Sequence, residues 1–364
     1  MSNRSRILIL SPTAFPSVTG NAATTERWRR SLEKKGYTAH VIATRDLDVA
    51  GLLHEIEYFK PHIIHVYHAF HSGVFLLDPR VSDACGGLSI VVSLPGTDAD
   101  LEAATQEHRD TIFKVCRKAH MITAQSDVII NRLKASLPEI VDRIVYIPKA
   151  PSWLGNDLFD LRSLAGCGSG DVLFFLPAGI RPVKGNLECL IAFKQLHQID
   201  PRARIVFSGQ VLDAEYGRLF QQELAQCIPF ARWVQVIAPA AMRSAYEGAD
   251  IVLNSSFSEG LSNVLLEAIL AGKPLLASNI PSTRWFVLGD GKSTPCGSLY
   301  DPHDPDDFCR QALGLINNEP LRMSLTEAAR DRALTLPTPA DEANALIRAY
   351  QKEAEGEELR AKYT

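Results

Sequence analysis

Short runs of apolar residues, most of them rich in Val, Ile or Phe, alternate along the chain with longer amphipathic stretches. Strands that alternate with helices in this way build a parallel sheet covered on both faces. In the first half of the chain the apolar runs occupy residues 6–10, 39–43, 62–68, 89–93, 121–124 and 143–147. In the second half they occupy residues 172–178, 204–209, 233–237, 250–256, 274–278 and 297–301. We therefore expect an α/β protein with two doubly wound domains.

The two sets of strands are separated by residues 157–170, where apolar periodicity is lost and glycine accumulates, so we expect a linker there. The pattern predicts an N-terminal Rossmann-like domain over residues 1–156 and a C-terminal one over 171–335. The tail, 336–364, is helical in pattern and could pack back on the N-terminal domain. Because ligands of open α/β sheets bind outside the carboxyl ends of strands, we expect the two domains to face each other across a cleft.

Composition narrows the class of protein. A length of 364 residues favours two hydrophobic cores, and a net charge of −4 lacks the basic excess of nucleic-acid-binding proteins. The seven cysteines are scattered and form no CxxC pair, which favours a reducing cytoplasm over disulfides or zinc. The amino-terminal apolar run, residues 7–10, is too short for a signal peptide or a membrane span. The sequence leaves the oligomeric state open.

Two loops of the first domain carry candidate chemistry. After the first strand, Gly20 and Asn21 open a helix whose amides and dipole favour an anion, although a simple strand-to-helix turn would use the same glycine. In "HVYHAFHSG", alternation sends His65 and His68 to opposite faces, so we expect no metal site there. His68 lies at the strand's carboxyl end and could contact a substrate.

The loop "SLPGTDADL" contains an Asp98-x-Asp100 pair, and such pairs can hold a divalent cation through oxygen ligands. Capping of the following helix by Thr97 or Asp98 explains the same residues more simply. We therefore expect no metal at this loop.

In the second domain, "PAGIRPVKGN" places Arg181 and Lys184 three residues apart, between a strand and a helix. Two cations in this position suit a diphosphate, since arginine can form two parallel hydrogen bonds and lysine supplies a point charge. In "NSSFSEGLSNVLLEAILAGKP" a strand ends near Ser256 and a helix begins after a turn. The residues of this turn and helix start expected to meet a phosphate are Gly260, Leu261, Ser262, Asn263 and Val264.

Two acids bracket that helix start. Glu267 lies roughly 7 Å along the helix from residue 262, at 1.5 Å per residue, and can reach hydroxyls beside a phosphate, such as those of a ribose. Glu259 precedes the helix and would meet the other end of the same ligand. The spacing therefore suggests a nucleotide-linked sugar with one acid at each end of its diphosphate.

Glu259 and Glu267 resemble the E-x7-E signature of retaining glycosyltransferases of family 4, and "AGIRPVKG" is similar to that family's arginine and lysine loop. The order of elements resembles the GT-B fold over nearly the whole chain. The resemblance implies that Arg181 and Lys184 bind the diphosphate, that Glu267 binds the ribose and that Glu259 lies near the donor sugar. It also implies that the backbone around Ile237 holds the nucleobase and that no metal or other cofactor is used.

A narrower resemblance rests on "TGNAATTERWRRSLEKKGY", "PGTD" and "NSSFSEGLSNVLLEA". These runs look like a subgroup that includes glycosyltransferase 1 domain-containing protein 1 and bacterial selenosugar synthases. The resemblance implies that residues of the first domain face the cleft around the donor phosphates and the acceptor, namely Gly20, Asn21, Thr25 and Arg27. Many family members carry a histidine before Gly96, where this chain has Pro95, so the role of that side chain is either absent or supplied by Thr97, Asp98 or a histidine of residues 65–71.

The sequence thus predicts a retaining glycosyltransferase that uses a nucleotide-sugar, with a UDP-sugar as the expected donor, and a small acceptor such as selenophosphate. A nucleotide-sugar epimerase of the same architecture is one alternative, and it would isomerise the donor without an acceptor. A non-catalytic nucleotide-sugar binder is the other, and Pro95 is the residue that favours it.

Overall fold

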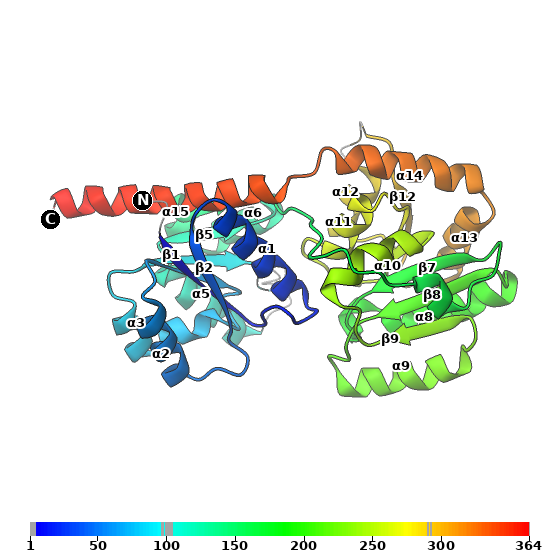
Figure 1. Cartoon of the computed structure of the whole chain (residues 1–364), viewed down its shortest axis with the longest axis horizontal. Helices are drawn as coiled ribbons and strands as arrows, with labels where there is room; N and C mark the ends of the chain where they lie inside the picture. Colours follow the sequence, from blue (N-terminus) through cyan, green and yellow to red (C-terminus); the bar gives the residue numbers. More distant parts are fainter. Residues whose placement is uncertain (1–4, 96–97, 99–104, 290, 292, 364) are drawn as a thin grey trace. The chain divides into compact units, whose positions relative to one another are not determined.

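The chain folds into two compact units, and each has its own sheet and core (Figure 1). The computed structural model describes residues 5–95, 98, 105–289, 291 and 293–363. Residues 1–150 and 337–364 form what we call the N-terminal unit, and residues 151–336 form the C-terminal unit.

The stretch expected to be the linker, residues 157–170, belongs to the C-terminal unit and contains helix α7 (Leu161–Ala165). Leu161 and Ala165 are buried in that unit's core, so this stretch carries a packed helix and the units divide after Ala150 instead. Glycine gathers here because Gly166 ends α7 in the left-handed conformation, at φ 64°.

The N-terminal unit contains a parallel sheet of six strands in the order β2-β1-β3-β4-β5-β6. The strands are β1 (Arg6–Ser11), β2 (Thr38–Ala43), β3 (Ile63–Tyr67), β4 (Ser89–Leu94), β5 (Met121–Ala124) and β6 (Ile144–Tyr146). The described helices are α1 (Gly20–Lys34), α2 (Val49–Phe59), α3 (Pro79–Ala84), α5 (Gln106–Lys118), α6 (Asp127–Ser136) and α15 (Pro339–Tyr363), with short 3-10 turns η1 (Gly73–Leu77) and η2 (Pro138–Arg143).

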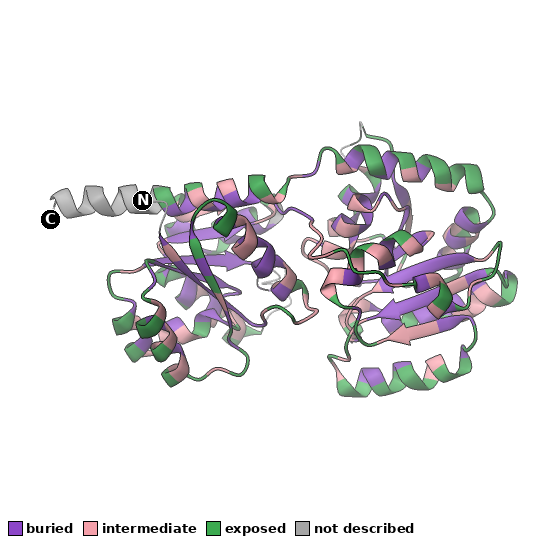
Figure 2. Ribbon diagram, viewed as in Figure 1, coloured by how far each residue is buried: buried purple, intermediate pink, exposed green. Residues whose placement is uncertain are grey.

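Both faces of this sheet are buried, because successive side chains of each strand point to opposite sides. In β1, Leu8 and Leu10 pack in one cluster, while Ile7 and Ile9 pack in another that includes Trp28 of α1. Figure 2 shows the result, with buried strands and helices exposed on their outer sides. The continuous apolar runs of the sequence are therefore those of a sheet covered on both faces.

The C-terminal unit repeats the design with a parallel sheet in the order β12-β11-β10-β7-β8-β9. The strands are β7 (Val172–Pro177), β8 (Ala203–Ser208), β9 (Ala231–Val234), β10 (Ile251–Asn254), β11 (Leu275–Ser278) and β12 (Gly297–Tyr300). Besides α7, the described helices are α8 (Asn186–Ile199), α9 (Ala214–Gln226), α10 (Met242–Gly248), α11 (Asn263–Leu270), α12 (Pro281–Leu288), α13 (Pro305–Ile316) and α14 (Glu319–Ala333), with 3-10 turns η3 (Pro182–Lys184) and η4 (Pro239–Ala241).

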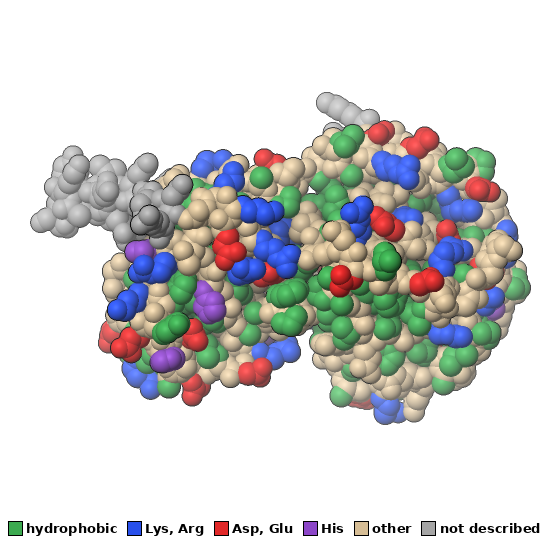
Figure 3. All heavy atoms as spheres, viewed as in Figure 1, with side chains coloured by type: hydrophobic (Ala, Val, Ile, Leu, Met, Phe, Trp, Pro, Cys, Tyr) green, Lys and Arg blue, Asp and Glu red, His purple; other side chains and the backbone are tan. Residues whose placement is uncertain are grey.

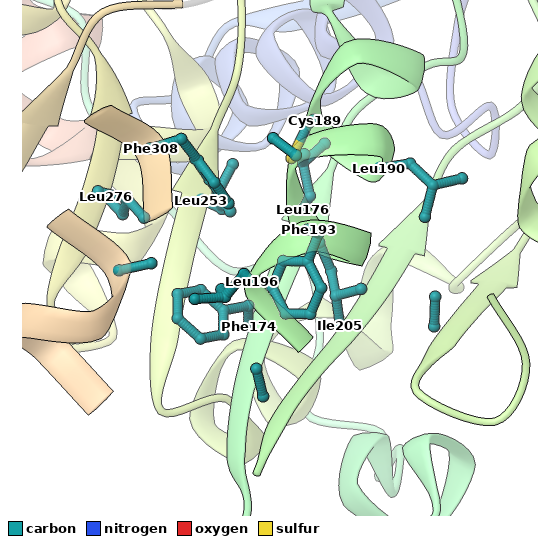
Figure 4. Packing of buried hydrophobic residues seen from close by; sticks show 14 of the residues in the cluster. Phe174, Leu176, Cys189, Leu190, Phe193, Leu196, Ile205, Leu253, Leu276 and Phe308 are labelled. Carbon is teal, nitrogen blue, oxygen red and sulfur yellow. The ribbon is translucent and has the colours of Figure 1, made fainter. Parts of the chain in front are cut away.

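One face of the second sheet packs against α8 and α13, and the contact is rich in phenylalanine (Figure 4). Phe174 of β7 meets Phe193 of α8 edge to face, with ring centroids 5.3 Å apart. On the other face, Phe175 packs with Tyr246 of α10 at 5.4 Å. These rings bury large apolar areas on both sides of β7 and hold this strand rigidly in the middle of its sheet.

The expectation of two doubly wound α/β units is confirmed, and every predicted strand is present with small shifts at its ends. The strand predicted over residues 62–68 ends at Tyr67, because His68 adopts a positive φ of 87° and leaves strand geometry. The strand predicted over residues 233–237 lies at Ala231–Val234. Within this strand the indole N–H of Trp233 donates to the carbonyl of Gly209 at 2.9 Å.

Each sheet has a point where the strand order reverses. In the N-terminal unit β1 lies between β2 and β3, and in the C-terminal unit β7 lies between β8 and β10. In doubly wound sheets the loops at the carboxyl ends of such neighbouring strands diverge and leave room for a ligand. The loops after β7 and β10 are therefore the first place to seek a site in the C-terminal unit.

Helix α15 belongs to the N-terminal unit although it follows the C-terminal unit in sequence, and it contacts α1, β4 and β5. Glu342 of α15 is fully buried and accepts hydrogen bonds from Arg27 of α1, at 2.6 Å from Nε and 3.0 Å from Nη2. Gln125 adds a third hydrogen bond at 3.1 Å. The helix is thus joined to α1 by a buried, two-point ion pair.

A second buried contact joins α15 to the sheet. The imidazole of His65 on β3 is hydrogen-bonded to the Tyr350 hydroxyl at 2.6 Å and to the Ser93 hydroxyl at 2.7 Å. Burial lowers the pKa of His65 to about 3, so the ring is neutral at pH 7. Trp28 stacks on this ring at 5.0 Å. His65 is therefore a buried core residue that links β3 to α15.

On the face drawn in Figure 3, Lys and Arg side chains gather with acidic neighbours over the N-terminal unit. On α1, Arg29 is paired with Glu26 and Glu33, and Arg30 is paired with Glu26. These cations are largely neutralised within their own helix. Within the described residues, no helix has both the length and the apolar character needed to cross a membrane.

The Arg27–Glu342 pair leads to a stability prediction. Glu342→Leu leaves the Arg27 charge buried without its acid, so we expect the N-terminal unit to lose about 3 kcal/mol or more of unfolding free energy. Arg27→Met combined with Glu342→Leu removes both charges and should recover most of that loss. Hydrogen exchange of α1 and β3 peptides across a urea titration would measure both, and equal losses in the two variants would contradict a role for the buried charge.

Candidate functional site

The loop after β7 carries the two predicted cations and is pinned by the helix that follows it. Arg181 and Lys184 flank the 3-10 turn η3, and Asn186 begins α8. The Asn186 side chain is buried, accepts the backbone N–H of Arg181 at 3.3 Å and donates to the carbonyl of Ala178 at 3.5 Å. The positions of both cations are therefore set by backbone contacts within the loop.

The loop after β10 is bonded directly to the loop after β7. The Phe257 N–H donates to the carbonyl of Val183 at 3.0 Å, and the Ser255 hydroxyl donates to the carbonyl of Lys184 at 2.7 Å. Gly185 adopts a φ of 60°, and a Cβ there would lie 2.3 Å from the carbonyl oxygen of Ser255. Only glycine allows this close approach, which brings the two loops together as one surface.

Lys184 and Glu259 form the centre of this surface. The Lys184 ammonium lies 2.5 Å from Oε1 of Glu259, and both side chains are largely buried. The same carboxylate oxygen accepts the Ser256 hydroxyl at 2.8 Å and the Asn254 amide at 3.3 Å. Burial raises the pKa of Glu259, but the Lys184 charge and the hydrogen bonds from Lys184, Ser256 and Asn254 outweigh it and lower the pKa below its ordinary value.

Arg181 presents an unsatisfied donor beside this pair. Its Nε is buried and has no hydrogen-bond partner among the described residues. A buried donor without a partner costs about 1–3 kcal/mol, and more when the group is charged. A guanidinium in this state at the carboxyl end of β7 indicates a place for an anion.

Helix α11 begins next to these side chains. Its N-cap, Ser262, is buried, and its hydroxyl does not cap the helix; the Asn254 amide approaches it at 3.5 Å instead. Gly260 and Leu261 lead into this start, and Asn263 and Val264 form its first turn. The dipole of the helix adds to the positive potential that Arg181 and Lys184 provide.

Glu267 is held by a residue that sequence reasoning missed. Its Oε2 accepts the hydroxyl of Tyr246 at 2.8 Å, and Tyr246 is fully buried between Trp153 and Phe175. Glu267 is therefore a half-buried acid with a fixed partner. In the sequence, Tyr246 could have been noticed as an aromatic residue with a polar hydroxyl, in the helix that precedes the apolar run of β10.

Asn254 and Ser256 also escaped notice as individual residues. They lie at the carboxyl end of β10, are buried, and both donate to Glu259. Buried polar side chains at the end of an apolar strand were the available signal, because such groups need partners. In this case the partner is Glu259, five residues after Asn254 and three after Ser256.

Ile237, chosen for its backbone, lies outside the strand. Strand β9 ends at Val234, and the Ile237 side chain packs in the core against residues such as Ala241. Its role beside a nucleobase stays a prediction.

In the N-terminal unit, two of the predicted residues lie at the start of α1 and two others are buried within the same helix. Gly20 and Asn21 open α1, which Thr19 caps by accepting the Ala22 N–H at 3.2 Å. Thr25 is buried and donates to the carbonyl of Asn21 at 3.0 Å. Arg27 is buried too, and its guanidinium is held by Glu342, so the structure turns both side chains toward the unit's interior.

His68 and Asp98 are brought into contact at the carboxyl end of β3. His68 Nδ1 lies 2.7 Å from Oδ1 of Asp98, and both residues are buried. Asp98 also accepts the backbone N–H groups of Ala69 and Phe70. The acid thus fixes the ring of a histidine that has a positive φ, and Gly96, Thr97 and Asp100 lie outside the described residues.

Comparison with known proteins gives a family match in the second half of the chain. Residues 171–318 match the family model described as glycosyl transferases group 1. The matched segment lies within the C-terminal unit. This segment contains Arg181, Lys184, Glu259 and Glu267 together with the strands that position them.

Relatives extend the likeness beyond this domain. Glycosyltransferase 1 domain-containing protein 1 of Xenopus tropicalis is 23% identical over 321 residues, covering 86% of this chain and 88% of that protein. D-inositol 3-phosphate glycosyltransferase of Corynebacterium aurimucosum is 28% identical over 159 residues, covering 42% of this chain and 37% of that protein.

Solved structures show the fold. Sucrose-phosphate synthase from Thermosynechococcus elongatus superimposes with a TM-score of 0.77 at 14% identity, covering 97% of this chain and all of that one (100%). Anabaena HepE, solved in complex with UDP and glucose, gives a TM-score of 0.76 at 14% identity over 96% of this chain and 100% of its own. The predicted GT-B fold is confirmed.

The close approach at Gly185 leads to a prediction with a matched control. Gly166 has nearly the same φ, 64°, but a Cβ there would meet nothing within 4 Å. We expect Gly166→Ala to cost about 1 kcal/mol for the left-handed backbone alone. Gly185→Ala should cost a further 1–3 kcal/mol or so, because the Ser255 carbonyl must move. Urea denaturation of both variants measures the difference, and equal costs would mean that the loops are not held together at this point.

Proposed function

We propose that this chain is a retaining glycosyltransferase of the family 4 type that transfers a sugar from a UDP-sugar to a small acceptor. The observation that carries the proposal is the unpartnered, buried Nε of Arg181 beside Lys184, within the segment that matches the glycosyl transferases group 1 model. The cations at the carboxyl end of β7 would bind the diphosphate of the donor. The start of α11 would bond its phosphate oxygens through backbone groups.

The two acids on either side of the helix start would bind the ribose and the sugar, the parts of the donor that flank the diphosphate. Glu267, oriented by the Tyr246 hydroxyl, would accept hydrogen bonds from the ribose. Glu259, at the other end of the helix start, would accept them from hydroxyls of the sugar. The base is proposed to be uracil, a choice supported by the Anabaena HepE structures, which contain UDP or UDP-glucose.

In the proposed reaction the bond between the sugar's anomeric carbon and the diphosphate oxygen breaks while the acceptor bonds to the same face of that carbon. The acceptor's proton passes to the departing phosphate oxygen. Arg181, Lys184 and the α11 dipole stabilise the charge that develops on the diphosphate, which is the main electrostatic contribution of the C-terminal unit. Because these groups supply positive charge themselves, we propose that the reaction needs no metal.

The acceptor is proposed to meet the N-terminal unit, where His68, fixed by Asp98, takes the place of the family's missing histidine at Pro95. The resemblance of the run around Gly20 to selenosugar synthases makes selenophosphate the first acceptor to test. A reducing compartment, the cytoplasm, is proposed because all seven cysteines are free thiols.

Product analysis tests this function. Purified protein would be incubated with UDP-glucose, UDP-N-acetylglucosamine and GDP-mannose, each alone and with selenophosphate, and the products followed by mass spectrometry. Nucleotide release that requires selenophosphate and yields a selenium-bearing sugar supports the proposal. If the sugar is isomerised without an acceptor, the protein is an epimerase instead. If the donor binds but no acceptor in a wider set accelerates nucleotide release, the protein is a nucleotide-sugar binder without catalytic activity.

The cations lead to a kinetic prediction. Lys184→Ala and Arg181→Ala should each lower turnover roughly 100-fold, since each removes charge that stabilises the leaving diphosphate. Lys194→Ala is the matched control, because Lys194 lies on α8 and is paired with Glu223 at 2.8 Å on the surface. Steady-state rates of nucleotide release would be compared, and a Lys184→Ala enzyme as fast as the control would refute the assignment.

A further inference from the structure

The acid at the sugar end of the site is bonded to the cation at the phosphate end. Oε1 of Glu259 accepts from Lys184 at 2.5 Å, from Ser256 at 2.8 Å and from Asn254 at 3.3 Å. All of the hydrogen bonds that Glu259 makes within the described residues fall on this one oxygen. Any diphosphate that binds Lys184 must therefore do so in the presence of a carboxylate that is fixed in place.

The carboxylate is held by residues at the end of β10 and in the loop that leads to α11. Asn254 is the last residue of β10, and its amide also approaches the Ser262 hydroxyl at the start of α11, at 3.5 Å. Ser256 donates its hydroxyl to Glu259, and its backbone N–H donates to the Asn254 side chain at 3.3 Å. Strand end, loop and helix start thus hold one acid together.

The charge of Glu259 persists at neutral pH. Although burial raises its pKa, the Lys184 charge and three hydrogen bonds lower it below the ordinary value. An ionised carboxylate accepts hydrogen bonds and cannot donate them. It attracts the hydroxyl groups of a sugar and repels an unsubstituted phosphate oxygen.

We propose that Glu259 is a specificity-determining residue that makes this site prefer a nucleotide-sugar to the nucleoside diphosphate left after transfer, with Asn254 and Ser256 as its positioning residues. The proposal rests on the proposed function, since it assumes that the diphosphate lies on Arg181 and Lys184. It adds a role in discrimination to the contact with the sugar.

The chemistry of the two ligands differs at the atom that Glu259 faces. In the nucleotide-sugar, the terminal phosphate carries the sugar and a single negative charge. After transfer, the terminal phosphate is unsubstituted and carries about one further negative charge at neutral pH, because its second pKa is near 6. Glu259 then competes with the product for Lys184 and repels its extra charge, which favours departure of the nucleoside diphosphate.

Binding measurements on Glu259→Gln test the proposal. Glutamine has the same shape and keeps acceptors for Ser256 and Asn254, but it lacks the charge. We expect UDP to bind the variant about tenfold more tightly than it binds the wild type, because one charge-assisted competitor for Lys184 is gone. UDP-glucose or UDP-N-acetylglucosamine should bind the variant no more tightly than it binds the wild type, because the charged acceptor for the sugar hydroxyls is lost, so the preference for the UDP-sugar over UDP falls at least about tenfold.

Glu223→Gln is the matched control, because it removes the same negative charge from a more exposed Lys–Glu pair of this unit, Glu223 with Lys194. Its preference between UDP-sugar and UDP should equal that of the wild type. Isothermal titration calorimetry at two salt concentrations gives both affinities. The gain in UDP affinity should shrink as salt screens the charges.

Ser256→Ala tests the positioning role without changing any charge. Loss of one hydrogen bond frees the Glu259 carboxylate to rotate, so the preference for the UDP-sugar should fall in the same direction by a smaller factor. Circular dichroism would show that each variant is folded.

The outcomes separate the two proposals. Equal changes in the affinities of UDP and the UDP-sugar in Glu259→Gln would overturn the discrimination role while leaving the nucleotide site in place. Weaker binding of UDP in this variant would overturn it as well, since Glu259 would then only hold Lys184 in position. A wild-type protein that binds neither ligand would overturn the proposed function and this inference with it.

Discussion

Parallel pairing of β7 with β10 is the constraint on which the candidate site depends. The two strands lie side by side, with Ile251 opposite Phe174 and Val252 opposite Phe175, so both end at the same edge of the sheet. Helix α8 and strands β8 and β9 lie between them in sequence, so the loops that follow β7 and β10 are distant along the chain but adjacent at this edge. Residues 181–185 and 255–262, far apart along the chain, are thereby brought within hydrogen-bond distance of each other.

The interior of the C-terminal unit provides the rigidity that such a site needs. Phe174 and Phe175 anchor β7 on both faces of the sheet, and Tyr246 belongs to the same packed core that holds Glu267 by its hydroxyl. A side chain whose partners are themselves buried keeps its position without a ligand, which lowers the cost of binding one. Arg181 is the exception, because its buried Nε has no hydrogen-bond partner among the described residues.

The N-terminal unit uses charged and polar residues for a different purpose. Buried contacts attach helix α15 to the N-terminal unit, to which the chain returns after completing the C-terminal unit. They pair Arg27 with Glu342 and His65 with Tyr350. A buried ion pair adds little net stability but strongly disfavours structures in which one partner is missing. We infer that these contacts select the correct docking of α15 among other apolar surfaces of the chain.

The contact between His68 and Asp98 at the end of β3 is another buried polar contact with a structural role. His68 adopts a positive φ, which is uncommon outside glycine. The Asp98 carboxylate contacts the His68 ring and accepts hydrogen bonds from the backbone N–H groups of the next two residues, Ala69 and Phe70. Local strain of this kind persists only where surrounding contacts hold it.

The sequence by itself determined the architecture and the chemical type of the site. Twelve apolar runs at strand length fix two parallel sheets, because buried strands need continuous apolar residues, and the spacing of Arg181 with Lys184 and of Glu259 with Glu267 identifies the loops after strands. Only the tertiary structure decided the partners. Glu259 meets Lys184 because β7 and β10 are neighbours, Glu267 meets Tyr246 because α10 and α11 pack on the same face, and Arg27 turns inward because α15 returns to α1. Periodicity reports which face of an element is buried, whereas a contact between distant residues depends on strand order and helix packing, which no local pattern encodes.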